Sequence, residues 1–168
     1  FSSCTAQWRA AGVAPRALEK IKGSRMPQTH KDDRLTSYCF EELEVGMSAE
    51  YRRRITGADV TQFAEVSGDI NPLHLDAEFA GRTMFEGKIV HGMYGAGMIS
   101  AVIGTCLPGP GCVYLSQSLR FLAPVRVGDE VVASARVVEL FPEKHRARMK
   151  TQCHVIETLV IDGEALIL

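Results

Sequence analysis

Residues 92–106 read GMYGAGMISAVIGTC and begin the longest uncharged stretch of the chain. Small residues recur in it at every fourth position, namely Gly92, Ala96, Ser100 and Gly104. That spacing places them on one face of a helix, although interior glycines cost a helix about 1 kcal/mol each relative to alanine. We therefore predict a helix whose small-residue face lies against another surface, either a tightly packed sheet or a ligand beside the helix N-terminus.

The residues after this helix alternate between apolar and polar side chains, a pattern typical of half-exposed strands. The run Pro108–Gly111 ends the helix. The predicted strands span residues 112–121, 131–140, 147–157 and 159–168. In the first strand we expect Leu115, Leu119 and Phe121 to share one face. Gly163, inside the last strand, predicts a bulge or a turn.

The residues before the helix predict one edge strand and two shorter helical elements. Residues 49–56 suit an edge strand, in which we interpret the triplet Arg52-Arg53-Arg54 as solvated, with proximity to acidic ligand groups as the alternative. Thr56 is a good N-cap for a helix over residues 58–66, and Asp76 can cap a second, shorter helical turn. The predicted order of elements is one strand, short helices, a long apolar helix and then consecutive strands. This order predicts an antiparallel sheet wrapped on a helix, an α+β layout.

The stretch between these helical elements concentrates acid/base groups on a rigid turn. The first helix stops at Gly68, and Asp69, Asn71-Pro72 and His74 follow directly. Because proline fixes its own φ and keeps the preceding residue out of the helical region, the chain kinks and can bring Asp69 and His74 together. A carboxylate beside an imidazole can hold one water and exchange protons with it, as general acid/base catalysis requires. The alternative is structural: Asp69 closes an Asx turn and His74 is a buried, satisfied polar group.

Two motifs in this region resemble the hydratase-2 signature of the MaoC-like dehydratases, the (R)-specific enoyl-thioester hydratases. They are Gly68-Asp69-x-Asn71-Pro72-Leu73-His74 and Ile89-Val90-His91-Gly92-Met93. The likeness continues through Pro108-Gly109-x-Gly111-x-x-Tyr114-Leu115-x-Gln117-Ser118-Leu119-x-Phe121 and Pro124-Val125-x-Val127-Gly128-Asp129-Glu130-Val131. It extends from Phe40 to the end of the chain. The resemblance implies the hot-dog fold, with the sheet wrapped around a long central helix, and a homodimer with active sites near the subunit interface.

The resemblance also implies a substrate and a role for each site residue. The substrate would be a trans-2-enoyl thioester, or a (R)-3-hydroxyacyl thioester in the reverse direction, of coenzyme A or acyl carrier protein. Asp69 and His74 would hold and activate the water of this hydro-lyase reaction. The backbone N–H of Gly92, at a helix N-terminus, would stabilise the negative charge on the thioester oxygen. We expect Asn71 to shape the turn and His91 to orient the entrance of the helix.

Ser100 and a possible metal site need separate interpretation. Ser100 matches a hydroxyl position in the family's helix and could support the catalytic pair, or it could bond back to its own helix. The resemblance implies no cofactor and no metal. A metal site would have to draw its ligands from Asp69, His74, Asp76 and His91. These residues form no compact ligand-pair motif, so we do not expect one.

Two other functions stay open beside the hydratase. A hot-dog acyl-thioesterase would attack the thioester carbonyl with water, and such enzymes often place a catalytic carboxylate on the central helix. Residues 92–106 contain no Asp or Glu, which argues against this class. A non-catalytic module that binds acyl thioesters would not need an intact pair of Asp69 and His74.

Residues 1–37 differ in composition from residues 38–168, which we assign to one hot-dog domain. Up to His30 the segment has only one acidic residue, Glu19, but several basic ones. This composition is typical of an organelle transit peptide, with a disordered basic tail as the alternative. A transit peptide would place the protein in the mitochondrion, where fatty-acid synthesis with acyl carrier protein as partner fits; otherwise we expect the cytoplasm.

The overall composition excludes several classes of partner. The chain has 168 residues with 19 Lys and Arg against 20 Asp and Glu, a net charge of -1 that predicts no nucleic-acid binding. No apolar run reaches the ~18 residues that a membrane span requires. The five cysteines are scattered without a C-x-x-C pair, which indicates free thiols in a reducing compartment.

Overall fold

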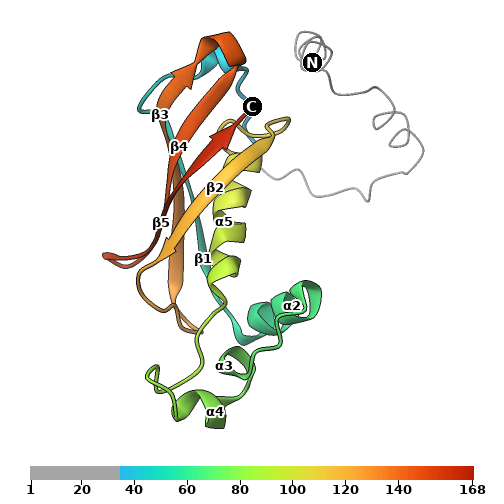
Figure 1. Ribbon diagram of the computed structural model, residues 1–168, viewed down its shortest axis with the longest axis vertical. Coiled ribbons are helices and arrows are strands. Elements are labelled where there is room, and N and C mark those ends of the chain that lie inside the picture. The colour runs from blue at the N-terminus through green and yellow to red at the C-terminus, as the bar shows by residue number, and fades with distance from the viewer. Residues whose placement is uncertain (1–34) are drawn as a thin grey trace, which may run out of the picture. The chain divides into compact units, whose positions relative to one another are not determined.

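A five-stranded antiparallel sheet lies against one long helix in the computed structural model of the chain, which describes residues 35–168 (Figure 1). The strands are β1 (Ser48–Arg54), β2 (Tyr114–Phe121), β3 (Glu130–Phe141), β4 (Arg146–Val155) and β5 (Thr158–Ile167). The helices are α2 (Gly57–Ser67), α3 (Pro72–Leu75), α4 (Ala77–Gly81) and α5 (Gly92–Thr105), with 3-10 turns η3 (Phe40–Glu42) and η4 (Pro142–Lys144). This arrangement confirms the predicted α+β layout.

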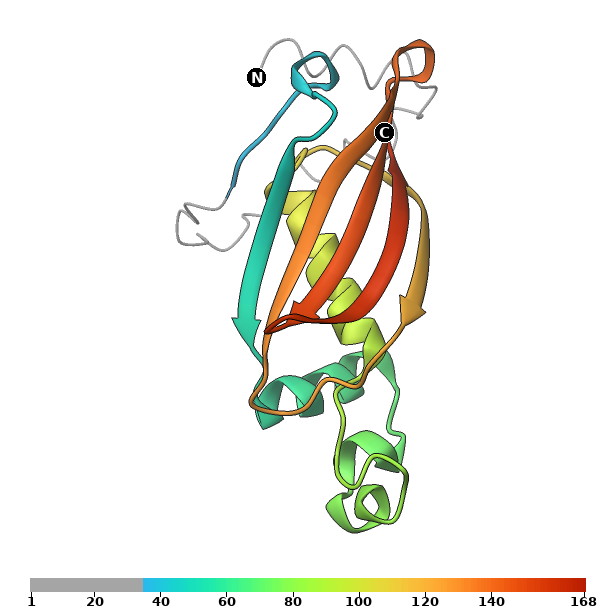
Figure 2. The ribbon, with the colours of Figure 1, turned by 90° about the vertical axis from the view of Figure 1, so that its left-hand side faces the viewer.

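The core lies between α5 and the inner face of the sheet, whose strand order is β1-β3-β4-β5-β2 (Figure 2). The buried residues of α5 are Gly95, Met98, Ile99, Val102 and Ile103. They face alternate residues of the strands, and in β4 the buried positions include Met149, Thr151 and Cys153. The alternation predicted for this strand is therefore confirmed.

The small-residue face of α5 does not lie against the sheet at Ser100 or Gly104, so the predicted packing against a sheet does not occur along that part of the helix. Ser100 is exposed, and a Cβ added at Gly104 would meet no atom within 4 Å. The face is turned outward because the bulkier residues of the helix bury more apolar surface when they face the sheet. Along α5, close approach occurs at Gly92, where a Cβ would overlap the ring of Phe121, and at Gly95, where a Cβ would overlap the end of the Ile161 side chain.

The start of β2 also differs from the prediction. The pairing of β2 with β5 shifts register between Tyr114 and Ser116, which marks a β-bulge. A bulge moves the following side chains to the opposite face of the sheet. As a result Tyr114 packs against the core, whereas Leu115, which we expected on the same face as Leu119 and Phe121, is 40% exposed.

Gly163 forms neither the bulge nor the turn that the sequence predicts. It pairs in register with Leu119 of β2 and Thr151 of β4. A side chain at Gly163 would overlap the backbone carbonyl of Ser118. The glycine is therefore explained by the close approach of the neighbouring strand.

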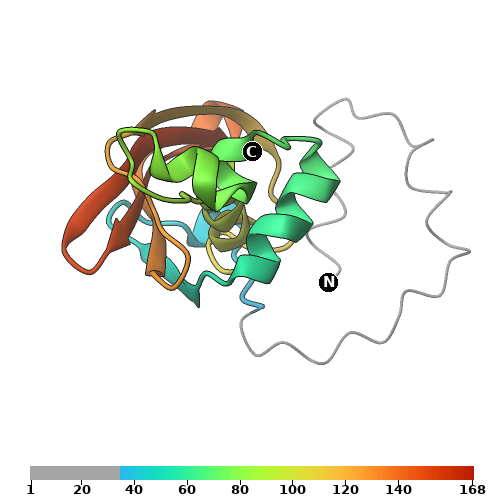
Figure 3. The ribbon, with the colours of Figure 1, turned by 90° about the horizontal axis from the view of Figure 1, so that it is seen from below.

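The short helices α2, α3 and α4 lie together at one end of the sheet, next to the N-terminus of α5 (Figure 3). Thr56 caps α2, because its hydroxyl accepts a hydrogen bond from the backbone N–H of Asp59 at 3.2 Å. Gly68 ends α2 with φ 78°, a left-handed conformation that suits glycine. Asp76 caps α4 by accepting from two backbone N–H groups. These three predicted boundaries are confirmed.

The arginine triplet belongs to the edge strand β1, but its members differ in their contacts. Arg52 pairs with the exposed Glu50 at 3.0 Å, and Arg54 donates to a backbone carbonyl of the β2–β3 connection at 2.9 Å. Arg53 forms an ion pair with Asp59, whose side chain is 8% exposed. All three arginines are exposed, which confirms the interpretation of the triplet as solvated. Arg53 differs from the other two because α2 brings a buried carboxylate to it.

The first described residues are attached to the end of α5. The N–H of Thr36 donates to the carbonyl of Thr105 at 2.9 Å, and the N–H of Tyr38 donates to that of Pro108 at 2.9 Å. The predicted transit peptide or tail spans residues 1–37, and its residues 1–34 lie outside the described residues. Within residues 35–168, no helix is both long and apolar enough to cross a membrane.

Asp162 of β5 is a buried carboxylate whose pKa lies well below its usual range. Hydrogen bonds from Lys150 at 2.7 Å, Arg120 at 2.5 Å and Gln152 at 3.1 Å stabilise the charged form. Asp162→Asn removes this charge, so we expect the free energy of unfolding to fall by roughly 1.5–3 kcal/mol, the contribution typical of hydrogen bonds to a charged group. Urea unfolding at neutral pH measures the loss.

The contribution of Asp162 should also depend on pH. Because its folded pKa lies below the unfolded value of about 3.9, the stabilisation is complete above that value and is lost as the pH falls through the folded pKa. The difference in stability between the parent and Asp162→Asn should therefore shrink on acidification below about pH 4. A difference that stays constant from neutral to acidic pH would contradict this assignment.

Candidate active site

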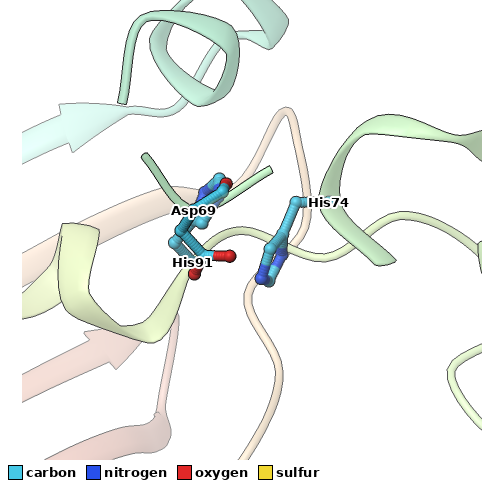
Figure 4. A group of neighbouring side chains, drawn as sticks. All are labelled: Asp69, His74 and His91. Atoms are coloured by element: carbon cyan, nitrogen blue, oxygen red, sulfur yellow. The ribbon is translucent and has the colours of Figure 1, made fainter. Parts of the chain in front are cut away.

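Three segments meet beside the N-terminus of α5 and bring Asp69, His74 and His91 together (Figure 4). A carboxylate oxygen of Asp69 and one ring nitrogen of each histidine all lie within 4.8 Å of one another. Asp69 follows α2, His74 lies in α3 and His91 directly precedes α5. The kink at Asn71-Pro72 therefore does place Asp69 and His74 side by side.

Asn71 shapes this kink and does not itself join the group of three. Its Oδ1 accepts a hydrogen bond from the backbone N–H of Leu73 at 3.0 Å, and Pro72 suits the first position of a helix because it needs no N–H there. The result is α3, one turn of helix where the sequence predicts only a turn. His74 lies in the last turn of α3.

His74 is buried, with 8% of its surface exposed, and its orientation is set by the backbone. Its Nδ1 lies 2.8 Å from the carbonyl oxygen of Ile89. Because a carbonyl only accepts, Nδ1 carries the hydrogen of the neutral ring. The lone pair of Nε2 is then left to accept a proton, which is the state that a general base needs.

His91 is the more deeply buried of the two histidines, with 2% of its surface exposed. Its Nε2 lies 3.0 Å from the backbone carbonyl oxygen of Asp69, so Nε2 carries the hydrogen. Its ring lies against that of His74, with centroids 3.8 Å apart, and against that of Phe63 at 5.0 Å. His91 thus ties the Asp69 turn to the start of α5.

Asp69 is exposed, in contrast to the two histidines. Its Oδ1 accepts a hydrogen bond from the backbone N–H of Asn71 at 3.3 Å, which is the Asx turn considered above. One contact of this kind leaves most of the acceptor capacity of a carboxylate free. The structural and the catalytic interpretations of Asp69 are therefore compatible.

Gly92 is the first residue of α5, and its backbone N–H has no partner within the helix. A Cβ added at Gly92 would lie 2.6 Å from Cε1 of Phe121. The ring of Phe121 therefore covers Gly92, and only glycine leaves room for it without displacement. The helix N-terminus favours negative charge at this point.

An apolar cavity of about 440 Å³ opens next to this helix end. Its lining includes His74, His91, Gly92, Tyr94 and Phe121. A cavity of this size with a few polar groups at one end is typical of a small-molecule site. The cavity does not include Ser100, which lies about 12 Å further along the helix axis and is exposed.

A second polar cluster braces the wall of the cavity behind Tyr94. Tyr94 lies close to the carboxylate of Asp59, and its ring contacts that of Phe63 at a centroid distance of 5.7 Å. Burial raises the pKa of Tyr94. The hydrogen bond from Thr56, followed by the contacts of Arg53, lowers the pKa of Asp59. This cluster links β1, α2 and α5, so it holds the helix end in place.

Three features of the site have no signal in the sequence around Asp69. They are the Ile89 carbonyl that orients His74, the Phe121 ring over Gly92 and the Tyr94–Asp59 contact. Phe121 belongs to the motif that carries the family resemblance, which is the only signal that could have pointed to it.

Three of the four residues that the sequence analysis considered as possible metal ligands, Asp69, His74 and His91, lie together in the described part of the chain. The fourth, Asp76, is not part of this group and caps α4 instead. The rings of His74 and His91 lie face to face, with centroids 3.8 Å apart and planes inclined by 32°. A zinc ion would need each donor at about 2.0–2.2 Å.

Comparison with known proteins identifies relatives over most of the described chain. Residues 41–161 match the family described as the MaoC like domain. A 3-hydroxybutyryl-CoA dehydratase of Methylorubrum extorquens is 54% identical over 128 residues, which cover 76% of this chain and 82% of that protein. A (R)-specific enoyl-CoA hydratase of Rhodospirillum rubrum is 46% identical over 136 residues, covering 81% and 94%.

A plant protein and a solved structure extend this comparison. A mitochondrial 3-hydroxyacyl-[acyl-carrier-protein] dehydratase of Arabidopsis thaliana is 39% identical over 127 residues, covering 73% of this chain and 75% of that protein. The unliganded structure of the R-hydratase PhaJ1 from Pseudomonas aeruginosa superimposes with a TM-score of 0.75 at 46% identity, covering 79% and 86%.

Proposed function

The chain belongs to the MaoC-like domain family, and on that premise we propose that it reversibly hydrates trans-2-enoyl thioesters to (R)-3-hydroxyacyl thioesters. The observation that carries this proposal is that a carboxylate oxygen of Asp69 and a ring nitrogen of His74 lie within 4.8 Å of each other and of a ring nitrogen of His91, the residue directly before Gly92. Relatives named as hydratases and dehydratases support the reaction class and the R configuration. The acyl group is carried by coenzyme A or acyl carrier protein.

The chemistry assigns one task to each part of the site. Asp69 and His74 hold a water between them; its oxygen adds to the β carbon while one of the pair takes its proton and the other delivers a proton to the α carbon. The electrons of the double bond move toward the thioester, whose oxygen gains negative charge in the transition state. The N–H of Gly92 and the dipole of α5 stabilise that charge. Asn71 and His91 position the pair.

One assay separates this function from its alternatives. We expect crotonyl-CoA to lose its enoyl absorbance with the enzyme, and chiral analysis should identify the product as (R)-3-hydroxybutyryl-CoA. Release of free coenzyme A thiol without this product would indicate a thioesterase instead. Binding of crotonyl-CoA without any turnover would indicate a non-catalytic module.

We also expect a homodimer. The outward face of α5, with exposed Ser100 and open space beside Gly97 and Gly104, lies on the side of the helix away from its own sheet and is available to a second subunit. The hot-dog fold supports the same expectation. Sedimentation should give a mass near twice the 18.4 kDa of this chain. A stable and fully active monomer at micromolar concentration would contradict it.

Residues 1–37 are proposed to direct the protein to mitochondria rather than to take part in catalysis. Their basic composition and the resemblance to the plant mitochondrial dehydratase support this. Removing residues 1–34, which keeps the hydrogen bond of Thr36, should leave the turnover of crotonyl-CoA unchanged. Residues 1–37 fused to a fluorescent protein should carry it into mitochondria, and diffuse cytoplasmic fluorescence would contradict the targeting role.

A further inference from the structure

Gly92 lies between two residues that both connect α5 to α2. His91, directly before it, bonds through Nε2 to the backbone carbonyl of Asp69, which follows the end of α2. Tyr94, two residues after Gly92, lies close to the carboxylate of Asp59 in the first turn of α2. The start of α5 is therefore attached to α2 and its C-terminal turn on both sides of the proposed oxyanion donor.

One aromatic side chain of α2 joins the two attachments. Phe63 follows Asp59 by four residues, so the two side chains share one face of α2. The ring of Phe63 contacts the rings of His91, at a centroid distance of 5.0 Å, and of Tyr94, at 5.7 Å. The N–H of Tyr94 also donates to the carbonyl of His91 at 3.0 Å, across the position of Gly92. One face of α2 therefore packs against the segment that carries the Gly92 N–H.

Asp59 is a fixed point for Tyr94, because its own side chain is buried and held from several directions. It accepts hydrogen bonds from the backbone N–H of Thr56 at 2.8 Å and from the Thr56 hydroxyl at 2.7 Å. It also forms an ion pair with Arg53 of β1. Hydrogen bonds to a charged group are about twice as strong as those between neutral groups. Tyr94 thus lies against a carboxylate whose position is set by β1 and by the first turn of α2.

This packing determines how the proton-transfer pair lies relative to the oxyanion donor. Asp69 follows the end of α2, whereas Gly92 begins α5, and the chain between them runs through α3, α4 and their connecting loops. Both groups must engage one substrate at the same time, and a misplacement of about 1 Å can cost roughly 10²-fold in rate. A side chain that attaches α5 to α2 can therefore act on the rate without touching the reacting atoms.

We propose that Tyr94 is a positioning residue, which aligns the Gly92 N–H with the thioester oxygen by attaching α5 to Asp59 of α2. The group that performs this task is the Tyr94 hydroxyl, while the ring packs against Phe63. This inference rests on the proposed hydratase function. It gives Tyr94 no part in the proton transfers, which stay with Asp69 and His74.

Tyr94→Phe tests the proposal, because it keeps the ring that contacts Phe63 and removes only the hydroxyl. We expect kcat for crotonyl-CoA to fall about 10-fold, within the cost of a misplaced reacting group, while KM stays at the parent value. A loss in kcat at constant KM marks an interaction that is made in the transition state. A rise in KM at unchanged kcat would show that Tyr94 only forms the wall of the cavity, and it would overturn the proposal.

A double variant tests whether Tyr94 acts through Gly92. Gly92→Pro removes the backbone N–H, so that no donor is left for Tyr94 to position. We therefore expect Tyr94→Phe combined with Gly92→Pro to be no slower than Gly92→Pro alone, whereas the losses of independent groups multiply in rate. Rates that fall by the full product of the two single losses would overturn the proposal.

Tyr114→Phe is the matched control for the loss of a hydroxyl. Tyr114 of β2 is also partly buried and packs against the core, but it does not line the cavity. Its kcat and KM should equal those of the parent, and thermal unfolding should show that both variants are folded. An equal fall of kcat in Tyr114→Phe and Tyr94→Phe would trace the effect to the fold as a whole and would overturn the proposal.

A measurement without any substrate separates this inference from the hydratase proposal. NMR relaxation gives the backbone order parameter of Gly92, which is about 0.85 where a backbone is rigid. It should fall in Tyr94→Phe and keep the parent value in Tyr114→Phe, also if the protein does not hydrate crotonyl-CoA. If the parent hydrates crotonyl-CoA while Tyr94→Phe keeps the parent order parameter and the parent kcat, the positioning role is overturned and the hydratase proposal stands.

Discussion

Asp69→Asn is expected to lower kcat for the hydration of crotonyl-CoA by roughly 10²–10⁴-fold, the usual contribution of a general acid/base group. Asparagine keeps the shape of the side chain and the acceptor for the N–H of Asn71, but it cannot take a proton from water. Because Asp69 is exposed, the free energy of unfolding should hardly change. Initial rates from the loss of enoyl absorbance measure the effect, with thermal unfolding as the test of folding.

His74→Asn removes the second group that we propose to act on the catalytic water. An asparagine amide can donate to the Ile89 carbonyl in place of Nδ1, whereas it has no basic lone pair in place of Nε2. We expect a similar loss of kcat. If both groups act on one water, the double variant should be little slower than either single variant. If the losses of transition-state stabilisation in the two single variants add fully in the double variant, the two residues act independently. If Asp69→Asn folds and hydrates crotonyl-CoA at nearly the parent rate, Asp69 is not catalytic.

Gly92→Pro is expected to lower kcat/KM for crotonyl-CoA by roughly 10²–10³-fold relative to the parent, which is the effect of losing one oxyanion donor. Proline has no N–H, yet it is well tolerated at the first position of a helix. The residue before it must be extended, and His91 already has φ -57° and ψ 129°. The substitution therefore removes the proposed donor without demanding a change in the backbone.

Gly92→Ala is the control for the space that a side chain takes at this position. Both variants add a Cβ that would lie 2.6 Å from the Phe121 ring, but alanine keeps the N–H. Phe121 is 53% exposed, so its ring can move aside. The ratio of rates between the alanine and proline variants then reports the donor itself. Equal rates in the two variants would show that the Gly92 N–H does not stabilise the transition state.

Local sequence was enough to predict most element boundaries. Thr56, Gly68 and Asp76 act on backbone groups within a few residues, so their roles as caps follow from the neighbouring sequence alone. The alternation in β4 is visible because one face of the strand is buried along its length. The Asp69–His74 pair is predictable for the same reason, since the kink at Asn71-Pro72 acts over a span of six residues.

The helix α5 shows where local sequence stops being sufficient. Its existence follows from a long apolar stretch that ends at Pro108–Gly111. The sequence does not show which face of the helix is buried, because small residues and bulky residues both recur at helical spacing. The outward position of Ser100 and the close contact of Gly95 with Ile161 depend on how the sheet approaches the helix.

The sequence by itself determined the strands, the long helix and the turn that carries Asp69 and His74, because each depends on interactions between residues close in the chain. Tertiary structure alone decided that His91 joins Asp69 and His74, and that the Ile89 carbonyl orients His74. It also decided that Phe121 covers Gly92. These contacts join residues far apart in the chain, and their geometry depends on how α5, the short helices and β2 pack together. No local pattern of residue types encodes that packing.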